Sequence, residues 1–278
     1  MMLSVRTASF ALAFGVIGVS SASAQISLAD LLREHNIVLD GRGVEGAFDD
    51  GQEPSPLGGR PGALAMPLAV LRSGSLRERT EAAYAFGALA GESGRSIPDF
   101  ADRTAAVSAL VELIASPDRR ARIAGARVIG RVLAVRFDLV VEPYPNGVLD
   151  ALFALLNQSN EVEQLAAMDA LGLIRASTAV TSLTERYWYY RNANKRALAG
   201  GALEALVRIG DPSTNAIAKQ LVNDRWAEGK DPTALAVLFA RARFLNDGSM
   251  LVIRQAMDEK SRRVQATQYF NELTPRVR

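Results

Sequence analysis

Apolar residues recur at the spacing of a helix through most of the chain, and residues 202–221 show the pattern clearly. Three apolar residues of this stretch share one helical stripe, namely Ala202, Leu206 and Ile209. Gly210 can adopt the left-handed turn at a helix end, and Asp211-Pro212 prevents continuation of the helix. A second helix, capped by Ser213 or Thr214, is expected to follow. The stretch therefore predicts a pair of helices whose apolar faces need neighbouring pairs to be buried.

A five-residue segment of this pattern recurs along the chain. Ala83-Tyr-Ala-Phe-Gly87 is echoed by Ala126-Arg-Val-Ile-Gly130 and by Met168-Asp-Ala-Leu-Gly172, and residues 201–204 keep its place without the glycine. The chain here resembles the HEAT-like repeats, in particular those of phycobilisome-lyase-type proteins. The resemblance is closest over residues 169–187 and 203–221 and extends over residues 63–278. It implies an all-α fold, a right-handed α-solenoid of five to six HEAT-like helix pairs.

The periodicity predicts six pairs of helices, with boundaries at 63–73 and 76–91, 103–115 and 118–136, 147–157 and 161–175, 178–191 and 194–209, 213–227 and 231–245, and 249–258 and 260–273. Ala126 and Ala167 fall where neighbouring helices should approach closely, so Ala167→Leu is expected to overpack the stack. Asp169 falls on the opposite stripe, where a change to serine is expected to be nearly silent.

Residues 1–24 have the pattern of a secretory signal peptide. Arg6 precedes an apolar run from Ala8 to Val19, and Ala22-Ser-Ala24 provides a cleavage site. The alternative is a membrane anchor, but this run is shorter than the roughly 20 residues that span a bilayer. The sequence therefore predicts cleavage after Ala24, a periplasmic or secreted bacterial protein, and no stable membrane insertion afterwards.

Residues 25–62 form a Gly/Pro-rich acidic arm that either trails or lies along the repeats. Gly41-Arg-Gly-Val-Glu-Gly46 matches the text of a dinucleotide-binding fingerprint. The residues after it do not open a helix, which such a site requires, so the match is interpreted as chance.

Composition narrows the chemistry further. His35 is the only histidine and there is no cysteine, so neither a histidine-based triad nor a multi-histidine metal site can be built within the repeats. No Ser-x-x-Lys occurs, and the paired His-Glu motifs of HEAT-like iron enzymes are missing, as is any mark of a bilin pocket. The formal charge of +2 for the whole chain argues against nucleic acid as a partner. We therefore expect no enzyme activity, no cofactor and no metal.

Two groups of residues are candidates for partner binding. The first is the arginine row, Arg120, Arg127 and Arg131, which shares one face of the helix predicted over 118–136, opposite an apolar stripe of Ala121, Ala124, Val128, Val132 and Val135. In HEAT-like arrays the second helix of each pair lines the concave surface, so the resemblance places the row in the groove. The alternative is a solvated face neutralised by Glu161 and Glu163.

The second group comes from the densest aromatic run of the chain, 185–191. Helical spacing places Tyr187 and Tyr190 in the core and directs Trp188 and Tyr189 elsewhere, near Arg191. Tyrosine, tryptophan and arginine dominate interface hot spots, so Trp188, Tyr189 and Arg191 are candidate anchors. The alternative is that they pack against the next repeat.

The function predicted from these patterns is a noncatalytic exported HEAT-repeat scaffold for protein–protein interaction. One alternative is a structural or regulatory subunit of a cell-envelope enzyme complex, and another is a carbohydrate or peptidoglycan binder. The opposite charges of the arm and the arginine row also suggest a hypothesis in which residues 40–53 cover the row until a partner displaces them.

Overall fold

The computed structural model describes residues 64–90, 100–134, 147–223, 225–228 and 232–274. These residues form helices and no strand, which confirms the all-α fold class. The predicted signal peptide and acidic arm, with His35 and the proposed contact of residues 40–53 with the arginine row, lie outside these ranges.

Twelve α-helices follow one another in six pairs within the described ranges. They are α2 (Ala65–Ser73) and α3 (Leu76–Ala90), α4 (Phe100–Ile114) and α5 (Arg119–Val132), α6 (Val148–Leu156) and α7 (Glu161–Leu173), α8 (Val180–Asn192) and α9 (Arg196–Ile209), α10 (Thr214–Gln220) and α11 (Pro232–Phe244), and α12 (Ser249–Ala256) and α13 (Arg263–Leu273). Two short 3-10 turns, η2 (Ser177–Ala179) and η3 (Arg225–Glu228), precede α8 and α11.

The predicted helix over 213–227 is wrong in its second half, because α10 ends at Gln220. The chain forms η3 instead, in which the Trp226 ring packs against two guanidinium groups. The Cζ atom of Arg191 lies 4.8 Å from the ring centroid, and that of Arg196 lies 5.1 Å from it. These contacts hold the tryptophan against α8 and the start of α9. The chain after α10 thus forms the short turn η3 and does not continue the helix.

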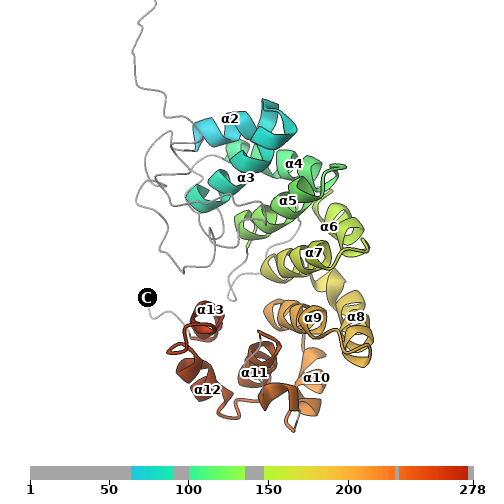
Figure 1. Ribbon diagram of the computed structural model, residues 1–278, viewed down its shortest axis with the longest axis vertical. Helices are drawn as coiled ribbons and strands as arrows, with labels where there is room; N and C mark the ends of the chain where they lie inside the picture. Colours follow the sequence, from blue (N-terminus) through green and yellow to red (C-terminus); the bar gives the residue numbers. More distant parts are fainter. Residues whose placement is uncertain (1–63, 91–99, 135–146, 224, 229–231, 275–278) are drawn as a thin grey trace, which may run out of the picture.

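The helix pairs stack side by side along an arc (Figure 1). Each first helix packs on its own second helix, and the second helices contact one another in the order α3, α5, α7, α9, α11 and α13. The second helices therefore form an inner layer along the concave side of the arc, and the first helices of the middle pairs, α4, α6 and α8, form its outer side. This arrangement is compatible with an α-solenoid.

The recurring glycine of the five-residue segment allows the inner helices to approach closely. A Cβ atom added at Gly130 would lie 2.7 Å from the Cα atom of Ala170, and one added at Gly172 would lie 2.8 Å from the Cα atom of Ala205. Contacts this short with a backbone atom exclude a side chain. The repeat in the sequence thus specifies the contact between one inner helix and the next.

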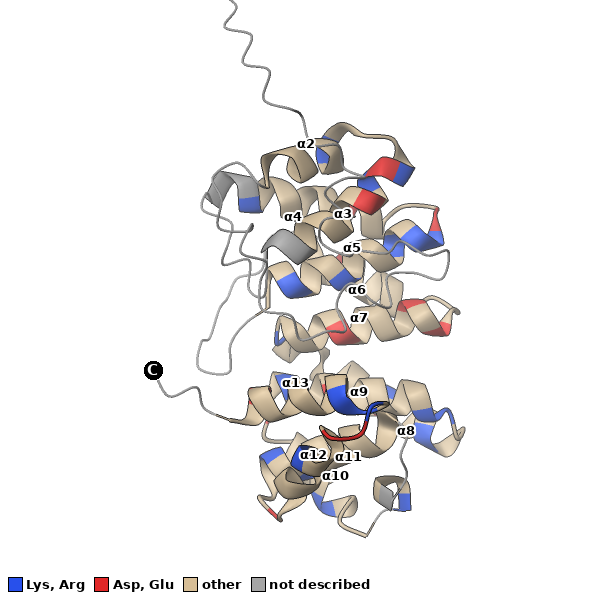
Figure 2. Cartoon of the chain, turned by 60° about the vertical axis from the view of Figure 1, so that its left-hand side comes forward, with Lys and Arg blue, Asp and Glu red and all other residues tan. Residues whose placement is uncertain are grey.

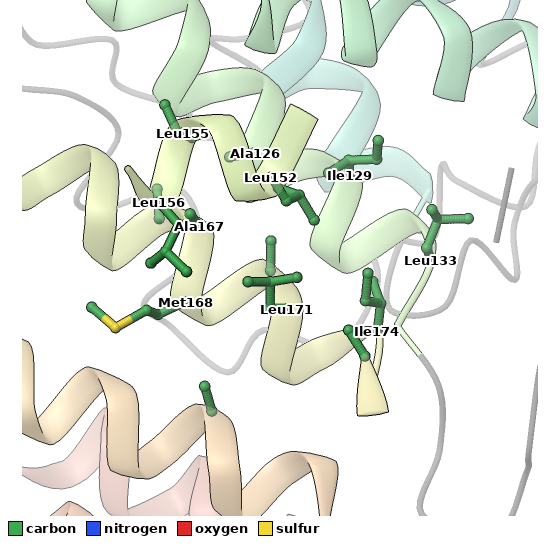
Figure 3. Packing of buried hydrophobic residues seen from close by; sticks show 14 of the residues in the cluster. Ala126, Ile129, Leu133, Leu152, Leu155, Leu156, Ala167, Met168, Leu171 and Ile174 are labelled. Atoms are coloured by element: carbon green, nitrogen blue, oxygen red, sulfur yellow. The ribbon is translucent and has the colours of Figure 1, made fainter. Parts of the chain in front are cut away.

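A continuous apolar core lies between the two layers. Ala126 and Ala167 are fully buried in it, as predicted. Leucine side chains of α6 enter between α5 and α7, where Leu152 lies near Ile129 and Leu171, Leu155 lies near Ala126, and Leu156 lies near Ala167 (Figure 3). Burying each of these leucines contributes roughly 1.5–3 kcal/mol.

The break at residues 210–213 has the predicted position but a different cap. Gly210 has a φ of +76°, as expected for a left-handed helix end. Ser213 begins α10 without capping it, and Thr214 is buried. The Asp211 Oδ1 atom accepts hydrogen bonds from the Ser213 backbone N–H at 2.8 Å and from its hydroxyl at 2.5 Å. The predicted hydroxyl cap is therefore not formed, and the Asp211 carboxylate instead fixes the turn that precedes α10.

Within the described ranges, no helix has the length and apolar composition needed to cross a membrane.

Candidate functional site

The arginine row lies on α5, which begins at an Asp118 cap whose Oδ1 atom accepts a hydrogen bond from the Ala121 N–H at 2.9 Å. Arg120 is exposed, whereas Arg127 and Arg131 are half-buried. Figure 2 shows basic residues along α5 and acidic residues on the neighbouring α7. Four residues of the predicted apolar stripe are buried, namely Ala121, Ala124, Val128 and Val132, while Val135 lies outside the described residues.

Glu161 and Glu163, which were considered as neutralising partners of this row, bind other cations. Glu163 is buried and accepts a hydrogen bond from the Arg122 Nε atom at 2.6 Å. Arg122 also donates to the backbone carbonyls before α5, and so ties this turn to α7. Glu161 forms an ion pair with the Lys195 Nζ atom at 3.1 Å.

Arg127 lines a cavity of about 210 Å³ on the inner layer. The other lining residues come from the next two inner helices and are Leu165, Ala166, Asp169, Gly201 and Glu204. Since every lining residue belongs to α5, α7 or α9, the cavity opens on the face of the inner layer that the outer helices leave uncovered.

The charged residues of this cavity occupy equivalent places in successive repeats. Arg127 and Asp169 are each the second residue of the recurring segment, as Tyr84 is on α3. Gly172 packs on Ala205 as Gly130 packs on Ala170, so the corresponding residue on α9 is Glu204. We refer to Tyr84, Arg127, Asp169 and Glu204 as the cross-helix ladder. Because each inner helix repeats the same register, the ladder runs across α3, α5, α7 and α9.

Two acidic residues of the ladder are held by Arg208, whose side chain is only 3% exposed. Its Nη1 atom lies 2.6 Å from Asp169 Oδ1, and its Nη2 atom lies 2.6 Å from Glu204 Oε1. A third carboxylate comes from the last helix, because Glu272 Oε1 lies 3.2 Å from Nη2. Arg208 therefore joins α7, α9 and α13 through three carboxylates.

Burial changes the acid–base properties of this cluster. It raises the pKa of Glu204, an effect that the positive charge of Arg208 partly offsets. Burial would lower the pKa of Arg208, but Glu204, Glu272 and Asp169 outweigh it and raise this pKa well above its ordinary value. Burial and the neighbouring Glu204 also raise the pKa of Tyr269, whose ring stacks on Phe239 at a centroid distance of 4.2 Å.

Arg127 differs from Arg208 in its surroundings. Among the residues that the structure describes, Arg127 makes no hydrogen bond or ion pair. Its positive charge acts on Tyr84. Burial raises the pKa of the Tyr84 phenol, and the charge of Arg127 partly offsets this rise. The cavity thus has one cation without a carboxylate partner on one wall and two paired carboxylates on the other.

The aromatic candidates of α8 separate into different environments. Tyr187 and Tyr190 are buried, which confirms their predicted place in the core. Trp188 is half-buried and packs edge-on against Tyr187, at 4.9 Å between ring centroids, whereas Tyr189 is 65% exposed. Arg191 donates a hydrogen bond to the Tyr187 hydroxyl at 3.1 Å and lies over Trp226. Tyr189 is therefore the member of this group that offers most of its side chain to a partner.

In the described part of the chain, no three His, Cys, Asp or Glu residues are grouped so that they could hold a metal ion. No family model matches the chain, and no curated protein or solved structure is found to be similar to it.

Proposed function

We propose that the chain is a HEAT-like, right-handed α-solenoid that is exported to the bacterial periplasm or secreted and binds a partner protein without catalysis. Six stacked helix pairs with a repeating inner register support the solenoid assignment. Repeats of this kind present an extended concave surface, which is suited to a chain segment of another protein.

Arg127 is the observation that carries this proposal. Its guanidinium is half-buried, faces a cavity on the inner layer and has no carboxylate partner among the described residues. A guanidinium binds a carboxylate through two parallel hydrogen bonds, and this interaction is stronger where water is partly excluded. The cavity of about 210 Å³ is smaller than the roughly 300–1,000 Å³ of typical small-molecule pockets, and it suits a single side chain of a partner.

The predicted alternatives receive different support. A carbohydrate binder needs exposed aromatic rings along the groove, but Tyr84 and Tyr269 of the inner helices are buried. A subunit of an envelope enzyme complex would use the same concave surface, so the two protein-binding functions differ only in what the partner does.

The proposal is tested by capture of partners from envelope extract with the tagged chain, followed by reconstitution of each complex from purified proteins. Arg127→Glu reverses the cavity cation, and we expect it to weaken the reconstituted complex at least tenfold, about 1.4 kcal/mol. Tyr189→Ser tests the alternative binding surface on α8, and the proposal expects it to leave the affinity unchanged. If Tyr189→Ser abolishes binding while Arg127→Glu does not, the partner uses the outer surface and the proposed site is wrong.

A further inference from the structure

We propose that the cavity at Arg127 selects a single carboxylate carried on a short aliphatic stem, and that it discriminates against phosphate. This inference rests on the proposed function, because it names the group that a partner inserts. A glutamate side chain has this chemistry, and so does the carboxylate at the end of a chain.

The pairing of charges around the cavity indicates where an anion can bind. Asp169 and Glu204 are each 2.6 Å from a nitrogen atom of Arg208, so each already has an ion-pair partner inside the fold. Arg127, on the opposite wall, has no such match among the described residues. The position in the cavity where an anion can form a new ion pair is therefore beside Arg127.

The walls indicate the shape of the group that carries this charge. Leu165 and Ala166 contribute apolar surface next to the charged residues. Gly201 lets the Leu165 side chain lie directly against the backbone of α9, because a Cβ atom at this position would lie 2.6 Å from the Leu165 Cδ2 atom. A few methylene groups can lie along this surface while the carboxylate reaches the guanidinium.

The two carboxylates of the far wall provide the selectivity. Asp169 and Glu204 line the same cavity as Arg127, so any anion bound there also experiences their repulsion. A carboxylate adds one negative charge, whereas a phosphate monoester adds about 1.5 to 2 at neutral pH. One arginine facing two carboxylates therefore favours a ligand with a single negative charge. The phosphate groups of nucleic acids and of phosphorylated proteins are expected to be poor ligands.

The test uses the mature full chain and four small probes: the acetylated amides of glutamate, glutamine and phosphoserine, together with N-acetylglycine. The readout is the NMR signal of the Arg127 side-chain Nε–Hε group, assigned by its loss in Arg127→Gln. We expect a saturable shift with the glutamate probe at millimolar concentration, since a ligand this small binds weakly. We expect no shift with glutamine and roughly tenfold weaker binding of phosphoserine.

Gly201→Ala serves as the second variant, because the added methyl group displaces the Leu165 side chain from its place in the cavity wall while leaving every charge in place. This variant is expected to bind the glutamate probe severalfold more weakly than the wild type does. Binding of N-acetylglycine as tight as that of glutamate identifies a chain end as the anchor, and weaker binding identifies a side chain. Equal binding of phosphoserine overturns the selectivity, and no glutamate shift at saturating concentration overturns the site.

The outcomes also separate this inference from the proposed function. If a reconstituted partner depends on Arg127 but the glutamate probe does not bind, the carboxylate anchor is wrong and the scaffold function stands. If the probe binds at Arg127 but no protein partner is found that depends on this residue, the ligand chemistry stands and the scaffold function is wrong.

Discussion

Arg127 and Arg208 lie on inner helices of the same stack, and Arg127 lines the cavity whereas Arg208 pairs with two carboxylates of its lining. Arg208 is almost completely buried and has three carboxylate partners from three helices. Arg127 is half-buried and has none among the described residues. Removing a charge from water costs several kcal/mol, so a buried arginine persists only where its partners repay that cost. Arg208 therefore belongs to the structure, and Arg127 is available to a ligand.

The two arginines also differ in what they connect. Through Glu272, Arg208 ties the last helix to a helix two pairs earlier, and so resists separation of α13 from the stack. In the described part of the molecule, Arg127 forms no ion pair that would link α5 to another helix. Substitution of Arg208 should therefore lower the stability of the fold, whereas substitution of Arg127 should lower the affinity for a ligand.

The largest effect is expected from Arg208→Met. This change leaves Asp169, Glu204 and Glu272 close together without their cation, and we expect the free energy of unfolding to fall by about 3–5 kcal/mol. Urea denaturation followed by circular dichroism measures it. Arg127→Met is the matched control and should change stability by no more than about 0.5 kcal/mol. Equal losses in the two variants would remove the distinction between the structural and the binding arginine.

A smaller loss is expected from Gly172→Ala, which tests the contact between inner helices. Its methyl group would lie 2.8 Å from a backbone atom of Ala205, so the helices must move apart, at a cost of roughly 1–3 kcal/mol. Gly201→Ala is the control, because its methyl group comes this close only to the tip of the Leu165 side chain, which can move aside by a side-chain rotation. Thermal unfolding should show a lower midpoint for Gly172→Ala than for Gly201→Ala. The reverse order would show that the inner contact is loose.

The smallest effect is a change in pH dependence produced by Glu204→Gln. Because burial raises the pKa of Glu204, the folded chain holds this proton more tightly than the unfolded chain does. The contribution of Glu204 to stability therefore declines as the pH rises from about 4.5, its ordinary pKa, through the raised value. Relative to the wild type, Glu204→Gln should gain stability as the pH increases over this window, as measured by urea denaturation at several pH values.

Glu78 provides a control of opposite sign for this measurement. Hydrogen bonds from the Ser75 hydroxyl and backbone N–H lower the pKa of Glu78, so its contribution is present above its ordinary pKa and is lost as the pH falls. Glu78→Gln should thus lose stability relative to the wild type at neutral pH and approach it in acid. Identical pH profiles for the two variants would contradict the assignment of the cluster.

The helices could be predicted from sequence because their apolar spacing is regular and their breaks contain glycine or proline. Tyr187 and Tyr190 follow from the same spacing, since both continue the stripe of α8. The η3 turn after α10 could not be predicted, because its Trp226 contacts arginines from two earlier helices. Local periodicity contains no information on such a contact.

The cavity was only partly predictable. Arg127 was identified from its helical face, but Asp169 was expected on a stripe where substitution is silent. That expectation conflicts with its contact of 2.6 Å with Arg208, which a serine could not reproduce. The copy at residues 201–204 aligns Ala202 with Arg127 and Asp169, so the equivalence of Glu204 is visible only from the contact of Gly172 with Ala205 in the structure. Glu272 could not have been found in this way, because the last repeat retains too little of the pattern.

The contact of Trp226 with Arg191 and Arg196 has an optical consequence. The chain has two tryptophans, and Trp188 lies on α8, the helix that also carries Arg191. Tryptophan fluorescence, excited where tyrosine does not absorb, therefore reports on the fourth and fifth helix pairs alone, whereas far-ultraviolet circular dichroism reports on every helix. Stacked repeats interact mainly with their neighbours, so their ends can separate before their centre unfolds. Comparing the two signals during one denaturation would locate where along the stack unfolding begins, without any added dye.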